Sequence, residues 1–204
     1  EQAIAAAIDA DRNHTVLARW VEGALASRNF RPEYAYYAKR AGAMAAGDAS
    51  PASVMAVVQA IGGDEGWYFA DLLWNIRRGL DWLAGGPSIR RKRRHPEQLR
   101  VGDVIDSWRV IAHDPDGGRL TLRMEMKGPG AGMLEFVVKP GPAGRGSTVH
   151  STAYWHPAGV PGLLYWYVLA PAHLFLFKGM TRAIQRRASA LERAYSAASP
   201  RGLK

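Results

Sequence analysis

The stretch GDVIDSWRVIAHDPDGGRLTLRMEMKGPGAGMLEFVVK, residues 102–139, alternates apolar and polar residues and is broken twice by turn residues. This period of two places successive side chains on opposite faces of a β-sheet. Asp114–Gly118 and Gly128–Gly130 supply the Asp, Pro and Gly residues that tight turns require. With a third turn at Pro140–Gly144, they predict an antiparallel meander of four strands: 102–112, 119–127, 133–139 and 148–155.

Centring each turn predicts how the strands pair. The residues expected opposite each other are Arg109 and Arg123, Glu125 and Glu135, and Val137 and His150. One face of the sheet is then apolar, with Trp108, Val110, Leu122, Met124, Met126, Leu134, Phe136 and Val138. The other face is mostly charged, with Arg109, Arg123, Glu125, Lys127, Glu135 and Thr152. This alternation predicts a sheet with one buried face, whose outer basic residues suffice to neutralise the two glutamates.

The segments before the meander favour helices and one further strand. Residues 67–83 carry apolar side chains at helical spacing, and Gly85–Pro87 ends that helix. Residues 53–61 are apolar and partly β-branched, so we predict a strand there. Further upstream the Ala-rich segments 1–10 and 33–46 predict helices, with a short strand at Thr15–Trp20 between them.

The last third of the chain begins with an apolar run. Residues 159–177, GVPGLLYWYVLAPAHLFLF, have the length of a bilayer span. Pro161, Pro171 and His173 interrupt the run, and apolar residues at helical spacing continue beyond it to Leu191. We therefore expect a buried segment that leads into a long C-terminal helix, with a membrane span as the alternative.

The order of these elements predicts the fold class. An N-terminal strand, helices, a meander and a long last helix are typical of the α+β helix-grip fold. In that fold a curved antiparallel sheet wraps on the C-terminal helix and leaves an apolar cavity between them. Gly47–Pro51 breaks the helical pattern, so we assign residues 51–204 to this domain and residues 1–50 to an N-terminal extension.

A series of short motifs runs through the proposed domain. They are GWYFADLLW (66–74), RKRRHP (91–96), GDVIDSWRV (102–110), EMKGPG (125–130), LEF (134–136), GLLYWY (162–167) and FKGM (177–180). In this order they resemble a bacterial family of unknown function in the polyketide-cyclase and START-like (SRPBCC) superfamily. The resemblance covers about residues 54–188. Ser88 and Lys92, where the family tends to have Gly, and Met133, where it tends to have Trp, depart from its pattern.

The resemblance also bears on what lies upstream. Members of that family often form the C-terminal half of proteins whose N-terminal half looks like an atypical short-chain dehydrogenase. The resemblance therefore implies that residues 1–50 are the tail of a missing nucleotide-binding domain that would hold NAD(P). No Gly-x-Gly-x-x-Gly turn follows a strand in this sequence, so we assign no cofactor site to the chain itself. The family has no settled catalytic residues to carry over.

Composition and charge exclude some classes. The chain has no Cys, which excludes a disulfide framework and a Cys nucleophile and fits a reducing cytoplasm. Its net charge is +9, and much of the excess lies in Arg90–Arg94. We interpret this run as a solvated loop, with attraction to phosphate or anionic lipid as the alternative. Nucleic-acid binding is disfavoured because no aromatic residues interleave the run.

Two residues are candidates for catalysis. By the predicted register Asp106 falls on the apolar face, where a carboxylate must be paired, hydrogen-bonded or neutralised. The alternative is that an irregular strand turns it outward or that it caps a turn. His173 lies among apolar residues, where most histidines only satisfy one hydrogen bond. The histidines show no metal-ligand spacing, so no metal site is predicted.

Three functions are compatible with these residues. The first is a cavity for a hydrophobic small molecule, which could serve as the substrate-holding half of an NAD(P)-dependent oxidoreductase. The second is a cyclase or hydratase that uses Asp106 with His173 or a Tyr. The third is a peripheral membrane module formed by Arg90–Arg94 and residues 159–177, which would place the protein at a membrane rather than free in the cytoplasm. The residues expected to line the cavity are Trp108, Met124, Met126, Phe136, Tyr165, Trp166 and Tyr167.

Overall fold

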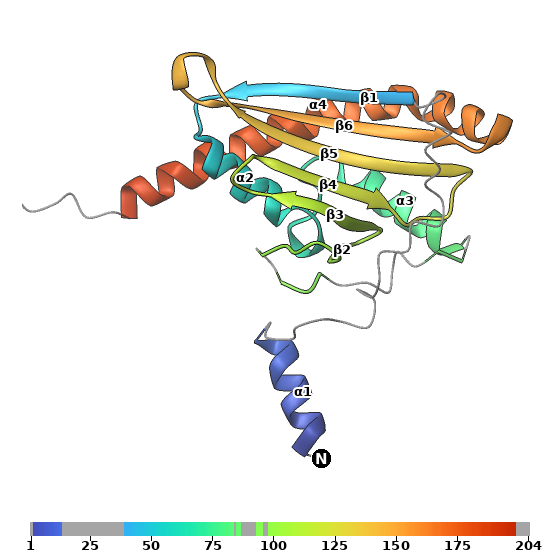
Figure 1. Cartoon of the computed structure of the whole chain (residues 1–204), viewed down its shortest axis with the longest axis horizontal. Coiled ribbons are helices and arrows are strands. Elements are labelled where there is room, and N and C mark those ends of the chain that lie inside the picture. The colour runs from blue at the N-terminus through green and yellow to red at the C-terminus, as the bar shows by residue number, and fades with distance from the viewer. Residues whose placement is uncertain (1, 14–38, 84, 87–92, 96–97, 199–204) are drawn as a thin grey trace, which may run out of the picture.

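Six antiparallel strands form one curved sheet, and a long C-terminal helix packs along it (Figure 1). The computed structural model describes residues 2–13, 39–83, 85–86, 93–95 and 98–198. The sheet order is β1-β6-β5-β4-β3-β2. The strands are β1 (Lys39–Gly47), β2 (Val104–Ile105), β3 (Trp108–Asp114), β4 (Arg119–Met124), β5 (Gly130–Pro140) and β6 (Ser147–Pro157). The α-helices are α1 (Gln2–Arg12), α2 (Pro51–Ala60), α3 (Asp71–Leu83) and α4 (Gly159–Ala198). The predicted α+β helix-grip class is confirmed.

The register of the meander is confirmed in two of its three predicted pairs. Arg109 faces Arg123, and Val137 faces His150. The pairing of Glu125 with Glu135 is wrong, because β4 ends at Met124 and Glu135 faces Thr121 instead. The connection from β4 to β5 spans residues 125–129, so the pairing is centred on Gly128 rather than on Gly130. The observed partner of Glu135 is four residues from the predicted one. Because four is an even number, the residues of β4 and β5 keep their predicted faces of the sheet.

Residues 53–61, predicted as a strand, form most of helix α2. The Ser50 side chain accepts a hydrogen bond of 3.2 Å from the Ser53 backbone N–H, and Pro51 occupies the first helical turn. Both are strong helix-start features. Val54, Met55, Val57 and Val58 are buried. A capped start and a buried helical face thus outweigh the strand preference of the β-branched residues.

Residues 39–47, placed in a predicted helix over 33–46, form the edge strand β1. It pairs along its whole length with β6, from Lys39 opposite Trp155 to Gly47 opposite Ser147. A side chain at Gly42 would collide with the Ser151 carbonyl, so β1 needs a small residue there. The close approach to β6 overrides the helix propensity of the alanines. The sheet therefore begins upstream of residue 50, and the strand predicted at Thr15–Trp20 lies outside the described residues.

The two remaining helix predictions hold with changed limits. Helix α1 confirms the Ala-rich helix predicted for residues 1–10. Helix α3 begins at Asp71 rather than Trp67, because Tyr68 and Ala70 have positive φ and cannot continue an α-helix. Its predicted apolar side is exposed to solvent, at Leu72, Ile76, Leu80 and Leu83.

Helix α4 is one continuous helix in which the two halves differ. Its C-terminal half buries Met180, Ile184 and Ala188 against the sheet. Residues 159–177 were expected to be buried, but the buried residues among them are Gly162, Trp166 and Phe177, and nine of the nineteen are exposed. Residues Gly159–Ala197 are long and apolar enough for one membrane span, and 22% of the apolar window is buried. The side chain of Gln185 fixes the helix to the sheet edge, donating to the carbonyls of Ala45 at 3.4 Å and Ser147 at 3.2 Å.

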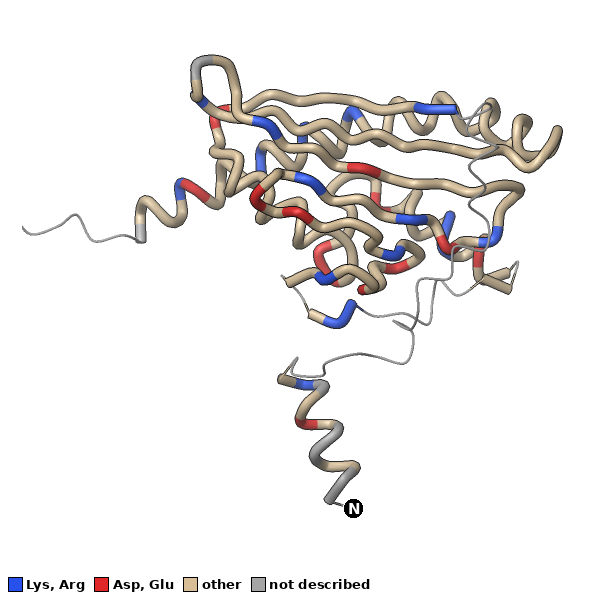
Figure 2. The backbone as a smooth tube through the Cα atoms, in the orientation of Figure 1, with Lys and Arg blue, Asp and Glu red and all other residues tan. Residues whose placement is uncertain are grey.

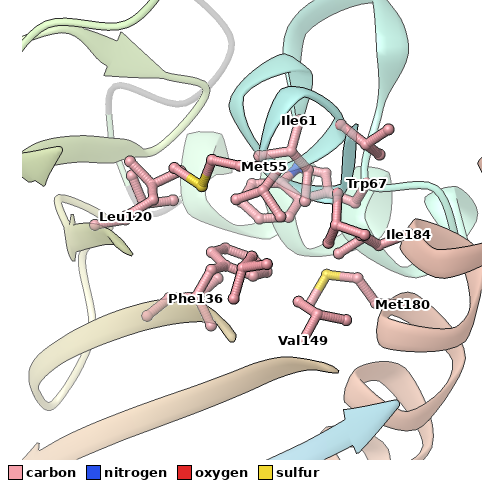
Figure 3. Packing of buried hydrophobic residues seen from close by; sticks show 14 of the residues in the cluster. Met55, Ile61, Trp67, Leu120, Phe136, Val149, Met180 and Ile184 are labelled. Carbon is pink, nitrogen blue, oxygen red and sulfur yellow. The ribbon is translucent and has the colours of Figure 1, made fainter. Parts of the chain in front are cut away.

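The core lies between the sheet and helices α2 and α4 (Figure 3). Phe136 and Leu120 from the sheet, Met55 from α2 and Met180 and Ile184 from α4 meet there, and all are almost fully buried. Basic and acidic residues are interspersed along the strands of the sheet (Figure 2).

The basic run at 90–94 is not simply a solvated loop. Arg94 is 2% exposed and forms an ion pair of 2.8 Å with the buried Asp103. Arg93 donates to the backbone carbonyls of Ile61 at 2.7 Å and His95 at 2.5 Å. Burial lowers the pKa of Arg93 to about 10. Residues 90–92 lie outside the described part of the chain, and two of the five charges are structural.

Phe136→Ala should lower the free energy of unfolding by about 3–5 kcal/mol, because it opens a cavity in a fully packed core. Urea denaturation followed by tryptophan fluorescence measures this change. The matched control is Phe175→Ala, since Phe175 is 57% exposed and its removal should cost about 1 kcal/mol or less. Equal losses in the two variants would contradict this placement of the core.

Candidate functional site

Two hollows lie on either side of helix α3. The first, the polar pocket, has a volume of about 310 Å³ and lies between the segment before α3, α3 itself and the turn between β2 and β3. The second, the apolar cleft, has a volume of about 330 Å³ and lies between α3 and α4 above the end of β4. A smaller chamber of about 60 Å³ adjoins the cleft toward β5 and β6.

Asp106 lies in the polar pocket rather than on the apolar face of a strand. It occupies the β2–β3 turn with φ of 51°, where Asp is tolerated better than most residues. Its Oδ2 accepts a hydrogen bond of 3.0 Å from Trp67 Nε1, and Arg78 Nη1 lies 3.9 Å from Oδ1. Burial raises the pKa of Asp106 above its usual range, against the opposing effects of Trp67 and Arg78. The carboxyl is therefore held at the pocket wall by an indole.

Backbone conformations that are rare for residues with a side chain gather at this pocket. Tyr68, Ala70 and Asp106 have φ of 64°, 53° and 51°. Such conformations persist only where the surrounding structure imposes them. Here they allow the chain to present the Trp67 ring, which stacks on Trp74 with centroids 4.4 Å apart.

The apolar cleft is lined by side chains from three elements. Helix α3 contributes one wall, helix α4 the opposite wall, and the end of β4 with the residues after it the floor. The lining residues are Leu73, Ile76, Arg77, Leu80, Asp81, Met124, Met126, Lys127, Tyr165, Leu169, Ala172, His173 and Leu176. The inner chamber shares several of these and adds rings, among them Trp74, Trp108, Trp155, Trp166 and Phe177.

Arg77 is the one arginine that lines all three hollows. Its Nε lies 3.0 Å from the Met126 sulfur, and its Nη2 lies 3.4 Å from the Met124 sulfur. A thioether is a weak acceptor that does not neutralise a guanidinium. Among the residues that the structure describes, no carboxylate forms an ion pair with Arg77. The cleft thus holds a positive charge whose partners are two sulfurs.

His173 and Trp74 each bring a buried polar atom without a partner. Within the described residues, His173 Nδ1 and Trp74 Nε1 have no hydrogen-bond partner. The His173 ring lies between Trp166 and Phe177, at centroid distances of 5.1 Å and 5.7 Å. Burial, followed by the charge of Arg77, lowers the pKa of His173 to about 4. The imidazole is therefore neutral at physiological pH, and both atoms can bond to a polar group of a ligand.

The structure places the predicted site residues in different ways. Trp108, Met124, Met126, Tyr165 and Trp166 line at least one of the three hollows. Phe136 is fully buried in the core, because its strand position faces α2 and α4 farther along the sheet. Tyr167 is 59% exposed on the outer side of α4, where Lys39 Nζ lies 5.7 Å from its ring centre. Neither Phe136 nor Tyr167 lines a hollow.

The two catalytic candidates do not share a cavity. Asp106 lines the polar pocket, and His173 lines the apolar cleft and the inner chamber. Arg77 lies at the wall of all three. An acid–base pair of Asp106 and His173 therefore finds no support in this geometry.

The outer-face glutamates are neutralised as the charge pattern predicts. Glu125 pairs with Arg109 at 2.5 Å and with Arg123 at 3.1 Å. Glu135 lies 3.7 Å from Arg119 and accepts a hydrogen bond of 3.2 Å from the Tyr154 hydroxyl. Over the described part of the chain, no group of three His, Asp or Glu side chains is placed to hold a metal ion.

Sequence reasoning missed Arg77 and Trp74. A signal for them was present, since Leu73, Trp74 and Leu80 lie three or four residues from Arg77 and share its side of the helix. An arginine within an apolar helical face is unusual, because burying a charge without a partner is costly.

Comparisons with known proteins give one family and several similar structures. A family model described as protein of unknown function (DUF2867) matches residues 32–180. No curated protein matches the chain. Among solved structures, the protein XoxI from Bacillus cereus is 16% identical with a TM-score of 0.43, over 75% of this chain and 97% of that one.

Two further structures are enzymes or parts of enzymes by their names. Norcoclaurine synthase from Thalictrum flavum is 14% identical with a TM-score of 0.43, over 83% of this chain and 98% of that one. The di-domain ARO/CYC BexL from the BE-7585A biosynthetic pathway is 12% identical with a TM-score of 0.42, over 72% of this chain and 46% of that one. Identities of this size say nothing of a shared ligand or reaction.

His173→Phe should remove a pH dependence of stability. The native imidazole has a pKa of about 4, whereas the unfolded one has its ordinary value of 6.5. Below pH 6.5 the unfolded chain binds a proton that the native chain does not, so stability falls as the pH drops toward about 4. The loss is on the order of 2 kcal/mol, with allowance for partial exposure of the ring. Urea denaturation at several pH values measures it. A wild-type minus variant difference that stays constant over this range would contradict the burial of the imidazole.

Proposed function

We propose that this chain, which belongs to the DUF2867 family of proteins of unknown function, binds a hydrophobic small molecule with one anionic group. The observation that carries this proposal is the apolar cleft built around Arg77. Its volume of about 330 Å³ lies within the usual range of small-molecule sites.

The walls of the cleft suit the apolar part of the ligand. Leu73, Ile76 and Leu80 on α3 lie across from Leu169 and Leu176 on α4. Removing this surface from water favours binding by about 25 cal/mol per Å² of apolar area. The methionines of the floor are flexible and polarisable, so they adapt to ligands of different shape.

Arg77 suits the anionic part. A carboxylate or phosphate next to it would replace two thioether contacts by charge-assisted hydrogen bonds, which are about twice as strong as neutral ones. His173 and Trp74, whose Nδ1 and Nε1 have no hydrogen-bond partner among the described residues, both line the inner chamber. They would bond to a further polar group of a ligand that enters it.

In this proposal the domain holds the substrate of a reaction whose chemistry lies elsewhere. The reaction would be an NAD(P)-dependent oxidation or reduction, carried out by a nucleotide-binding domain that the present sequence does not contain. The proposal assigns no catalytic group to the cleft, and it confines the role of this chain to holding and orienting the ligand.

Ala172→Trp should abolish binding at the cleft, because an indole at this wall position fills the space that the ligand needs. The measurement is a titration with Nile red, a neutral hydrophobic dye, followed by its fluorescence. The matched control is Ala190→Trp at an exposed position of the same helix, which should bind as the wild type does. Unchanged titration of Ala172→Trp would place the dye elsewhere and contradict the cleft as the site.

Arg77→Met should distinguish recognition of the anionic group from binding of the apolar part of the ligand. It should weaken binding of anilinonaphthalene sulfonate, a hydrophobic anion, about 10- to 100-fold, since a hydrogen bond to a charged group contributes about 1.5–3 kcal/mol. Binding of Nile red should change little. Arg182→Met, at an exposed position of α4, serves as the control for lost net charge. Equal weakening of both dyes by Arg77→Met would show that Arg77 shapes the cleft without recognising an anion.

A further inference from the structure

The first half of helix α4 carries an exposed apolar stripe. Its members are separated by three, four or seven residues and therefore lie along one side of the helix. They are Val160, Leu164, Tyr167, Val168, Leu174 and Phe175, each more than half exposed. We call them the α4 stripe. The opposite side of the same helix is buried at Trp166 and Phe177.

Helix α3 adds a second exposed apolar row beside the cleft. Leu72, Ile76, Leu80 and Leu83 follow one another along its outer side and are between 51% and 73% exposed. Ile76 and Leu80 also line the cleft, across from Leu169 and Leu176 of α4. The residues of the α4 stripe do not themselves line the cleft, so the two rows are exposed apolar surfaces on neighbouring helices. Exposed apolar surface of this extent marks an interaction site.

The charges near the α4 stripe are all of one sign along the helix. From Gly159 to Leu191 the helix contains no acidic residue, and its first charged residue is Lys178. Lys178 and Arg182 continue the line of the stripe by helical spacing, and both are exposed. Lys39 extends over the ring of Tyr167 at 5.7 Å. Figure 2 shows the first half of α4 free of charge and the basic residues beyond it.

We propose that the α4 stripe, with the outer row of α3, docks onto a membrane surface that contains anionic lipid. Apolar side chains that enter the interface and basic residues that attract anionic headgroups are two signals that add. The helix lies on the membrane and does not cross it, because its other side packs against the sheet through the fully buried Met180 and Ile184. A helix that spans a bilayer would expose that side to lipid.

A second copy of the chain fits this face less well than a membrane does. An isologous dimer places the same surface on both partners. It would bury Lys39, Lys178 and Arg182 of both copies against a helix that has no acidic residue between Gly159 and Leu191 to pair with them. An anionic lipid surface complements them. This docking does not require that the cleft hold a ligand.

The test is flotation with vesicles at low salt. The chain should float with vesicles of phosphatidylcholine and phosphatidylserine, and much less with phosphatidylcholine alone. Val168→Glu should weaken the partition about tenfold, because it removes an apolar contact and adds repulsion from the anionic surface. The matched control is Val101→Glu, since Val101 is 53% exposed on a loop outside the stripe and should float as the wild type does.

Two outcomes would overturn the proposal. One is absence of flotation with anionic vesicles. The other is a dimer by sedimentation equilibrium that Val168→Glu dissociates, which would make the stripe a contact between copies. Val168 does not line the cleft, so the variant should still bind Nile red in solution. Loss of flotation with retained dye binding therefore separates a failure of docking from a failure of the cleft.

Discussion

The packing of the second half of α4 against the sheet is the constraint on which the rest of the structure depends. Met180 and Ile184 enter the core beside Phe136 and Val149, and Gln185 ties the helix to the edge formed by β1 and β6. A helix fixed at one end and continuous over 40 residues extends beyond the core that holds it. Its first half therefore lies beyond the part of the sheet that packs in the core. The apolar cleft is the space between this half, α3 and the last residues of β4.

The same arrangement separates the polar groups into two environments. Asp106 lies with Arg78 in a pocket of polar character, held by the indole of Trp67. His173 lies on the other side of α3 among aromatic rings, where its neutral form is favoured. Arg77 lies between them with two sulfurs as neighbours. A ligand that spans both environments would have to match an apolar wall, a fixed cation and neutral hydrogen-bonding atoms.

Local patterns predicted the parts of the fold that depend on local chemistry. The meander follows from alternation and turn residues, and the long last helix from its spacing. Residues 39–47 and 53–61 were assigned to the wrong element because their structure depends on partners far along the chain or on a cap. Arg93 and Arg94 bind Asp103 and backbone carbonyls that no local pattern places beside them. For the site, the rings of the cleft were predicted in part. Phe136 was misplaced because a strand pattern gives the face of a residue but not its position along the strand. Tyr167 was misplaced because it is next to Trp166 in sequence but lies on the outer side of the helix.

The pairing of β1 with β6 has a consequence for how the chain folds. Gly47 lies opposite Ser147, so this pairing joins segments about 100 residues apart. Contacts of such separation slow folding, because the intervening chain loses its freedom before the contact stabilises it. The helix that covers both strands is synthesised after them. The nascent chain therefore exposes the apolar face of its sheet until synthesis reaches α4, and during that interval it depends on chaperones or on its own solubility.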